Sequence, residues 1–221
     1  MSSQSYSLDD LPEEIPVFPL AGALLLPRGR LPLNIFEPRY VAMIEDALRT
    51  PHRLIGMIQP LDPEDKSREP DLYRIGCAGR IIQFEETGDG RYLITLAGVS
   101  RFEVREEMPQ YRGYRPALVS WDTFAADLQS DPPTGFDRAR LLKGLKVFLS
   151  EQGVAADWPS IEKAPDEPLI TTLAMVCPFP PSEKQALLEA ANNDDRASTM
   201  TALIEMALAE PDDYGTPDRL H

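Results

Sequence analysis

Residue types that carry enzyme chemistry are scarce in this 221-residue sequence. It has 2 histidines and 2 cysteines, and it contains no Gly-Lys dipeptide. A P-loop needs Gly-Lys followed by Ser or Thr to hold phosphates, so no ATPase motor is expected. A histidine-based triad would have to use His52, because His221 is the last residue. A zinc centre needs a cluster of Cys and His that is absent here. These shortages predict a non-catalytic protein with no metal and no cofactor.

Positive charge and long apolar runs are also in short supply. The 22 Lys and Arg residues stand against 36 Asp and Glu residues, which gives a net charge of −14. Phosphate neutralisation dominates nucleic-acid affinity, so this balance argues against DNA or RNA as a partner, and it disfavours an anionic membrane. The most apolar stretch, 20–26, is far shorter than the about 18 residues of a membrane span. Residues 1–14 lack the basic and apolar parts of a signal peptide.

We therefore expect a soluble, cytoplasmic protein with no membrane partner. In such a compartment Cys77 and Cys177 are expected to be reduced, buried thiols, and one disulfide remains a formal alternative.

Short β-rich runs dominate the first half of the sequence. The clearest hairpin signal is the turn Thr87-Gly88-Asp89-Gly90 between two such runs. One helix interrupts the strands and begins at Pro38, whose missing N–H costs nothing in a first turn. The expected strands are 15–20, 31–36, 53–59, 74–86, 91–97, 101–105 and 114–121. Strands of this kind around one helix predict a small twisted barrel or two packed sheets.

The hydrophobic period changes to that of helices after about residue 125. Helices are expected over 136–151 and 169–176, from Ser182 and from about Asp195, and 159–168 is expected to be a proline-rich connector. The sequence thus predicts an α+β chain with a β-rich subdomain at 12–122 and a helical one at 123–211. Residues 1–11 and 212–221 are expected to be flexible tails.

Three stretches carry a resemblance to a known family. Residues 15–48 begin with P-V-F-P-L, continue through L-L-P-R-G and L-P-L, and reach F-E-P-R-Y before a helix. Residues 75–104 hold the hairpin, and residues 179–208 hold the closing helices with S-E-K-Q-A-L-L-E. In this order they resemble the N-terminal domain of Lon proteases, and the likeness covers about residues 14–210.

The resemblance implies a fold and a class of function. The fold is a small β-barrel-like (PUA-like) subdomain with one inserted helix, followed by a helical bundle. The function is recognition of protein substrates, and the same β-rich unit also occurs in proteins that hold small ligands. The resemblance implies no catalytic residue, since the ATPase and peptidase parts of the protease lie beyond this domain.

The F-E-P-R-Y motif, Phe36, Glu37, Pro38, Arg39 and Tyr40, has two interpretations. In the structural one, an ion pair between Glu37 and Arg39 locks the strand-to-helix corner, with Phe36 and Tyr40 packed beneath it. In the functional one, Arg39 or Tyr40 faces a bound peptide.

Peptide binding needs exposed apolar surface or an open strand edge. The apolar residues that could supply it are Leu24, Leu25, Leu26, Phe84, Trp121 and Phe124. Residues of these types more often belong to a core, so each is also a candidate core residue.

Three functions follow as hypotheses. The first is a binding module for unfolded or client proteins, acting as an adaptor or holdase. The second is a small-ligand binder that uses a groove in the β-rich unit. The third is a hydrolase with a Ser–Lys dyad, which the 5 lysines leave open because the two side chains need only meet in space. The protein is expected to be a monomer or a weak homodimer.

The structural interpretation of the motif makes a prediction about stability. If the Glu37–Arg39 pair locks the corner, Arg39→Ala lowers the thermal midpoint, because the helix start loses its charge-assisted contact. Differential scanning calorimetry of the two proteins measures the effect, and an unchanged midpoint contradicts the structural interpretation.

Overall fold

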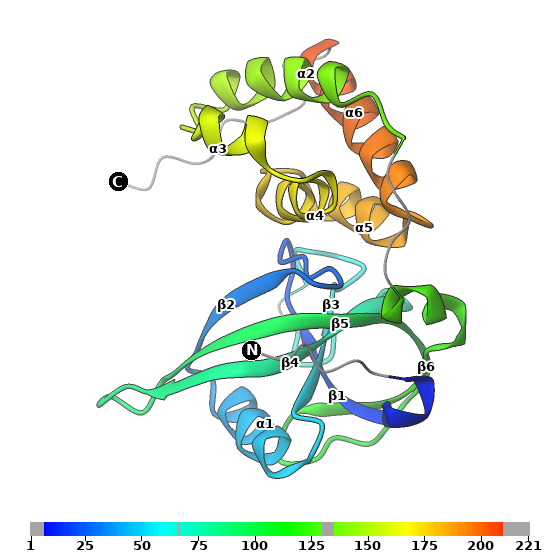
Figure 1. Ribbon diagram of the computed structural model, residues 1–221. Helices are drawn as coiled ribbons and strands as arrows, with labels where there is room; N and C mark the ends of the chain where they lie inside the picture. Colours follow the sequence, from blue (N-terminus) through cyan, green and yellow to red (C-terminus); the bar gives the residue numbers. More distant parts are fainter. Residues whose placement is uncertain (1–6, 66, 130–134, 210–221) are drawn as a thin grey trace. The chain divides into compact units, whose positions relative to one another are not determined.

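The computed structural model describes residues 7–65, 67–129 and 135–209. The chain divides into two compact units, Met1–Asp131 and Pro132–His221. The described strands lie in the first unit, and the second consists of helices (Figure 1). This order of strands before helices is the α+β arrangement that the sequence predicts.

One mixed sheet organises the first unit. Its strands are β1 (Glu14–Pro19), β2 (Arg30–Ile35), β3 (Leu54–Ile58), β4 (Ile75–Glu86), β5 (Tyr92–Glu107) and β6 (Arg115–Ser120). They lie in the order β2-β5-β4-β3-β1-β6, and β5 also pairs with β6. The pairings therefore return on themselves through β1, β3, β4, β5 and β6, which we call the ring. Because β2 lies outside the ring on β5, the sheet is not a clean barrel.

Three helices accompany the sheet. The inserted helix α1 (Pro38–Arg49) begins with Pro38 in its first turn, as predicted. The 3₁₀ helices η1 (Leu8–Asp10) and η2 (Asp122–Leu128) flank the first and last strands. η2 is interrupted at Phe124, whose backbone angles are not helical.

β5 is one long strand where the sequence predicts two, 91–97 and 101–105. Residues 98–100 lie between them, and at the first of these, Gly98, the chain passes close to another segment. A Cβ there would lie 1.9 Å from the carbonyl oxygen of Leu26. The Gly98 N–H donates to Gly29 O at 2.9 Å, and the Arg28 N–H donates to Gly98 O at 2.9 Å. The loop before β2 therefore lies directly on the middle of β5.

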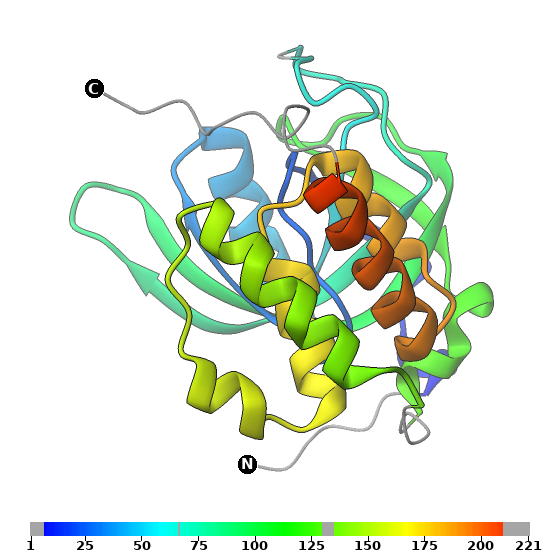
Figure 2. The same ribbon diagram turned by 90° about the horizontal axis from the view of Figure 1, so that it is seen from above.

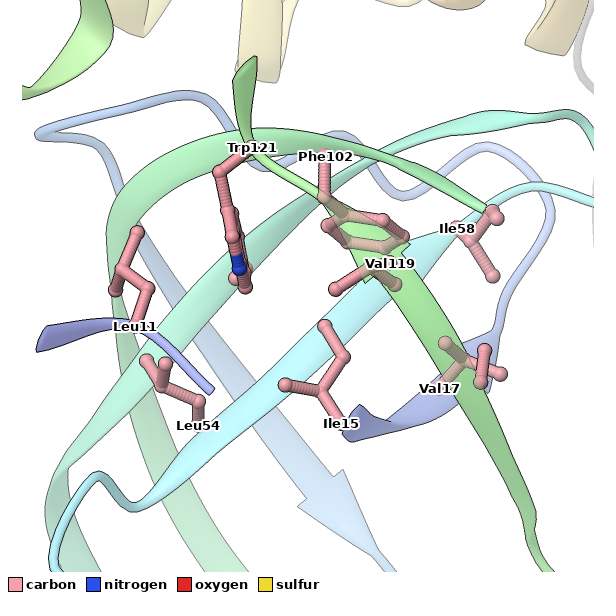
Figure 3. Packing of buried hydrophobic residues seen from close by; sticks show 10 residues of the cluster. Leu11, Ile15, Val17, Leu54, Ile58, Phe102, Val119 and Trp121 are labelled. Atoms are coloured by element: carbon pink, nitrogen blue, oxygen red, sulfur yellow. The ribbon is translucent and has the colours of Figure 1, made fainter. Parts of the chain in front are cut away.

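The core of the first unit fills the inside of the ring. Figure 3 shows side chains from β1, β3, β5 and β6 pointing toward one another, among them Ile15, Phe102 and Val119. The Phe102 and Trp121 rings meet edge to face, with centroids 6.0 Å apart. The Trp121 indole N–H donates to Pro12 O at 3.0 Å, so this large side chain is both buried and hydrogen-bonded.

A buried ion pair fastens η2 to β5. The Arg101 guanidinium donates to both carboxylate oxygens of Asp127, at 2.9 and 2.8 Å, and the Arg101 backbone N–H donates to the same carboxylate at 2.9 Å. The two side chains are 4% and 9% exposed. The guanidinium carbon also lies 4.4 Å from the centroid of the Phe124 ring. Charge, hydrogen bonds and aromatic contact therefore act at one point.

The second unit is a bundle of five helices within 135–209. They are α2 (Arg138–Glu151), α3 (Trp158–Lys163), α4 (Asp166–Val176), α5 (Pro181–Glu189) and α6 (Asn193–Ala209). α6 contacts α2, α4 and α5 (Figure 2). Phe148 and Phe179 stack with centroids 5.4 Å apart and the ring planes 17° from parallel.

The prediction of a proline-rich connector over 159–168 is wrong. α3 and the start of α4 occupy this stretch. The Asp157 carboxylate accepts a hydrogen bond from the Ser160 N–H and caps α3, with Pro159 in the first turn. A proline in a first turn lacks only an N–H that would be unpaired there, so it opens a helix instead of ending it.

Both cysteines are buried thiols that form no disulfide, as predicted. Burial raises the pKa of the Cys177 thiol to about 12. The thiol therefore stays protonated at neutral pH.

The Arg101–Asp127 pair yields a prediction for stability. Asp127→Ala should lower the free energy of unfolding by about 3 kcal/mol, because it removes the carboxylate to which the buried Arg101 guanidinium and backbone N–H donate. Urea denaturation monitored by tryptophan fluorescence measures the loss. Arg74→Gln is the matched control, since it removes an ion pair to Glu103 in which the arginine is 70% exposed. It should cost less than about 1 kcal/mol. Equal losses in the two variants would contradict a structural role for the buried pair.

Candidate functional site

The structure buries five of the six apolar residues that the sequence offers for peptide binding. Leu24, Leu25 and Leu26 lie in the loop that crosses Gly98, and all three are buried. Trp121 and Phe124 belong to the core around the ring and η2. Only Phe84 is exposed, at 43%. Exposure is the condition for contact with a ligand in this conformation, so these five residues serve as core.

The F-E-P-R-Y motif forms the predicted ion pair. The Arg39 guanidinium donates to Glu37 Oε2 at 2.9 Å, and its carbon lies 4.5 Å from the centroid of the Tyr40 ring. Tyr40 is buried against Phe18, with ring centroids 4.2 Å apart, and burial raises the pKa of its phenol. These contacts fix the corner between β2 and α1.

Phe36 departs from the prediction that it packs beneath the corner. Its side chain is 62% exposed. Phe36 directly follows the last residue of β2. The Arg91 guanidinium carbon, next to the hairpin turn, lies 6.0 Å from the centroid of the Phe36 ring. The strand directs alternate side chains to opposite faces, and the inward position before it is already filled by buried Ile35.

The outer halves of β4 and β5 form a hairpin that extends beyond the ring (Figures 1 and 2), and β2 runs along its side. We call this part, 81–97 with 30–36, the arm. Four large apolar side chains of the arm are exposed: Phe36, Ile82, Phe84 and Leu93. We call them the arm surface.

An open groove accompanies the arm surface. It has a volume of about 770 Å³, and Pro32, Ile82, Phe84 and Leu93 line it. Phe84 meets Tyr92 edge to face at 4.8 Å, so its ring is held in place although it is exposed. In the register of β4 and β5, Phe84 pairs with Ile94 and Leu93 pairs with Glu85, so Phe84 and Leu93 point to opposite faces of the arm. Apolar side chains that gather on one face mark interaction sites, whereas single exposed ones are ordinary.

A second cavity lies between α1, the strands β1, β3 and β6, and the segment that joins β5 to β6. Its volume is about 460 Å³. We call it the proline pocket, because Pro12, Pro16, Pro109 and Pro116 line it. Polar groups at its wall come from Glu14, Asp46, Thr50, His52, Tyr111 and Tyr114.

The two tyrosines of the proline pocket come from one tight hairpin. The backbones of Tyr111 and Tyr114 exchange hydrogen bonds of 2.9 and 3.0 Å around Arg112 and Gly113. Both turn residues have positive φ, 50° and 87°. A two-residue turn of this type matches the twist of the strands and favours glycine at its second position.

Ion pairs fasten this turn to α1. The Arg112 guanidinium donates to Asp46 at 2.7 Å and to Glu45 at 3.0 Å. The Tyr114 hydroxyl donates to the other oxygen of Asp46 at 3.1 Å. Burial, and then the negative charge of Asp46, raise the pKa of Tyr114 to about 12.

The hairpin at Tyr111–Tyr114 was not predicted from the sequence. The available signal is Tyr111-Arg112-Gly113-Tyr114, in which a residue pair ending in glycine separates two aromatic residues. The pattern does not reveal which residues bind Arg112, because Glu45 and Asp46 are far away in the sequence.

The described residues hold no group of three or more His, Cys, Asp or Glu side chains placed to bind a metal ion. Within the same residues, none of the helices combines the length and the apolar character needed to cross a membrane.

Comparison with known proteins places the chain in a family context. Residues 14–205 match the family described as the ATP-dependent protease La (LON) substrate-binding domain. Lon protease 2 of Myxococcus xanthus is 26% identical over 201 residues, which are 89% of this chain and 24% of that protein. Lon protease 2 of Thermus thermophilus is 26% identical over 204 residues, 90% of this chain and 25% of that protein. The chain thus spans about a quarter of the length of these relatives.

Solved structures agree in fold. A Lon N-terminal domain protein from Xanthomonas campestris aligns with a TM-score of 0.60 at 23% identity, covering 86% of this chain and 97% of that one. The N-terminal domain of a Mycobacterium avium complex Lon protease also gives 0.60, at 15% identity, covering 87% and 98%. At these identities the likeness shows the fold.

Tyr114 gives a prediction for stability at high pH. Its unperturbed pKa is 10.0 and its pKa in the folded protein is about 12. Between these values the unfolded chain releases the phenolic proton and the folded protein keeps it, so the free energy of unfolding falls as pH rises. Tyr114→Phe should flatten this fall, because phenylalanine has no proton to lose.

Urea midpoints measured from pH 9 to pH 12 test this expectation. Tyr111→Phe is the control, because the Tyr111 ring is 57% exposed. Parallel pH profiles for the wild type and Tyr114→Phe would contradict the assignment.

Proposed function

Because this chain belongs to the family of the ATP-dependent protease La (LON) substrate-binding domain, we propose that it is a non-catalytic module that binds exposed apolar or unfolded segments of proteins. The family description supplies substrate recognition as the general role. The relatives continue well beyond the matched part, and the comparisons reach only the substrate-binding domain. The proposal is therefore a recognition module or adaptor, with protein clients as partners and no nucleic acid or membrane.

The arm surface is the observation that carries this proposal. Phe36 and Leu93 are 62% and 42% exposed. Leu93 stands on β5, where it pairs with Asn34 of β2, and Phe36 directly follows the last residue of β2. Anchors on rigid strands lose little side-chain freedom when a partner covers them. An unfolded client offers the complementary apolar side chains.

The free edge of β2 is a weaker contributor. β2 ends the strand order, so its outer side pairs with none of the described strands. Pro32 interrupts that edge, because a proline has no N–H to donate to an added strand. Side-chain burial on the arm surface is therefore the main source of affinity.

The size of the surface sets the strength of binding. Burying one large apolar side chain contributes about 1.5–3 kcal/mol. Association costs about 4–15 kcal/mol of lost freedom. A few such anchors support dissociation constants in the micromolar range or weaker. Reversible capture of this strength suits recognition by a monomer or weak homodimer in the cytoplasm.

The two subdomains have different roles in this proposal. The β-rich region 12–122, of the PUA-like type implied by the family, carries the arm. The helical region 123–211 completes the module.

The proline pocket favours a second candidate function, the binding of a small ligand. Its volume of about 460 Å³ lies in the range of small-molecule sites, and its wall combines apolar side chains with a few polar groups. The arm surface and the proline pocket are separate sites, so the two functions can be tested separately.

Protein binding is tested with a permanently unfolded client, reduced and alkylated α-lactalbumin. The double variant Phe36→Ser/Leu93→Ser should raise the dissociation constant at least tenfold, because it removes two apolar anchors. Fluorescence anisotropy of the labelled client gives the constants.

Met206→Ser is the matched control, because Met206 is 63% exposed on α6 and lies outside the arm. It should leave the constant unchanged. Equal affinities for all three proteins would remove the arm surface from the proposal, and no binding by the wild type would refute the protein-binding function.

A further inference from the structure

We propose that the proline pocket selects an organic cation: an ammonium or guanidinium group carried on an apolar stem. This inference rests on the second candidate function, ligand binding in the pocket, and it adds the chemical class of the ligand. It does not depend on protein binding by the arm.

The pocket wall is apolar and poor in backbone donors. Pro12, Pro16, Pro109 and Pro116 have no N–H, and Ile15 and Leu54 add aliphatic surface. An anion or a carbonyl-rich ligand needs donors, and these positions offer none. Aliphatic walls suit a hydrocarbon stem.

Two side-chain donors of the pocket wall already form hydrogen bonds within the protein. The Tyr114 hydroxyl donates to Asp46 at 3.1 Å, and the Thr50 hydroxyl donates to Ala47 O at 2.8 Å. The remaining polar side chains of the wall are the carboxylates of Glu14 and Asp46, which accept, and His52 and Tyr111, which can donate. A ligand that donates hydrogen bonds fits this wall better than one that accepts them.

Two carboxylates face the pocket, and they differ in their partners. Asp46 is paired with Arg49 at 2.9 Å and with Arg112 at 2.7 Å, so its charge is largely balanced. Glu14 is exposed at the start of β1, and it forms no ion pair with any of the described residues. Glu14 is thus the carboxylate that a bound cation would meet.

An aromatic rim completes the match. Tyr111 is 57% exposed, and its ring stands nearly perpendicular to that of Tyr114, at 86° with centroids 5.8 Å apart. The electron-rich face of a tyrosine ring attracts ammonium and guanidinium groups. A carboxylate and tyrosine rings at the wall of one cavity, together with aliphatic side chains, are a combination that recognises organic cations.

The test compares a cation with its neutral isostere. N-acetyl-arginine amide and N-acetyl-citrulline amide differ in guanidinium against urea and have nearly the same shape. Each is titrated into the isotopically labelled full chain at about 150 mM salt, where long-range attraction to an acidic surface is screened. Two-dimensional NMR reports both the affinity and the place of binding.

The arginine compound should bind about three- to tenfold more tightly than the citrulline compound, as expected for one ion pair and one cation–π contact. Shifts should centre on Glu14, Tyr111 and Tyr114. Glu14→Gln and Tyr111→Ala should each reduce this preference. Glu64→Gln is the matched control, because it removes the same charge from an exposed loop residue outside the pocket, and the preference should survive it.

The source of the cation is resolved by a second pair of probes. A heptapeptide with one central arginine between leucines is compared with its citrulline counterpart. If the peptide binds at least tenfold more tightly than the free amide, the ligand is a basic side chain of a protein. If the two bind equally, it is a small molecule.

Equal affinity for the arginine and citrulline compounds, with shifts at the pocket, would overturn the inference and leave ligand binding in the pocket intact. Shifts spread over the acidic surface, with the same loss in Glu64→Gln as in Glu14→Gln, would also overturn it. The absence of binding by every probe would refute both the inference and the second candidate function.

Discussion

The contact between Gly98 and the loop before β2 is the constraint on which the first unit depends. A Cβ at Gly98 would lie 1.9 Å from Leu26 O, so the approach requires glycine. It occurs where β5 passes from the ring to the arm. The loop crossing there buries Leu24–Leu26 and delivers the chain to β2, which then pairs with the outer half of β5. One backbone contact thus separates a closed core from an open, partly exposed arm.

Local patterns predicted the elements well and their burial poorly. The turn at 87–90 and the proline-started α1 follow from residues close in sequence, and both are present. Residues such as Leu24–Leu26 more often belong to a core than to a binding surface, and the structure buries all three in the loop that contacts the distant Gly98. Phe36 looked like a packing residue because its neighbours are, yet the adjacent inward position belongs to Ile35. The proline pocket was beyond prediction, since its walls come from three separate stretches, 12–16, 46–54 and 108–116, that meet only in the fold.

The two candidate sites use opposite physical means on the same sheet. The arm surface relies on apolar area at the edge of the fold, where affinity grows with the number of anchors and demands little geometric precision. The proline pocket relies on placed charges and rings, because the Arg112 turn is tied to Glu45 and Asp46 on α1. Promiscuous capture and selective recognition can therefore coexist in one small unit.

The four prolines of the pocket have a thermodynamic consequence. Each has its φ angle fixed by the pyrrolidine ring, so these four positions have little φ freedom even in the unfolded chain. A ligand that enters meets a surface with little entropy left to lose. Such a cavity is rigid. It binds a ligand whose shape and charge both match the wall, and it adjusts little to other ligands.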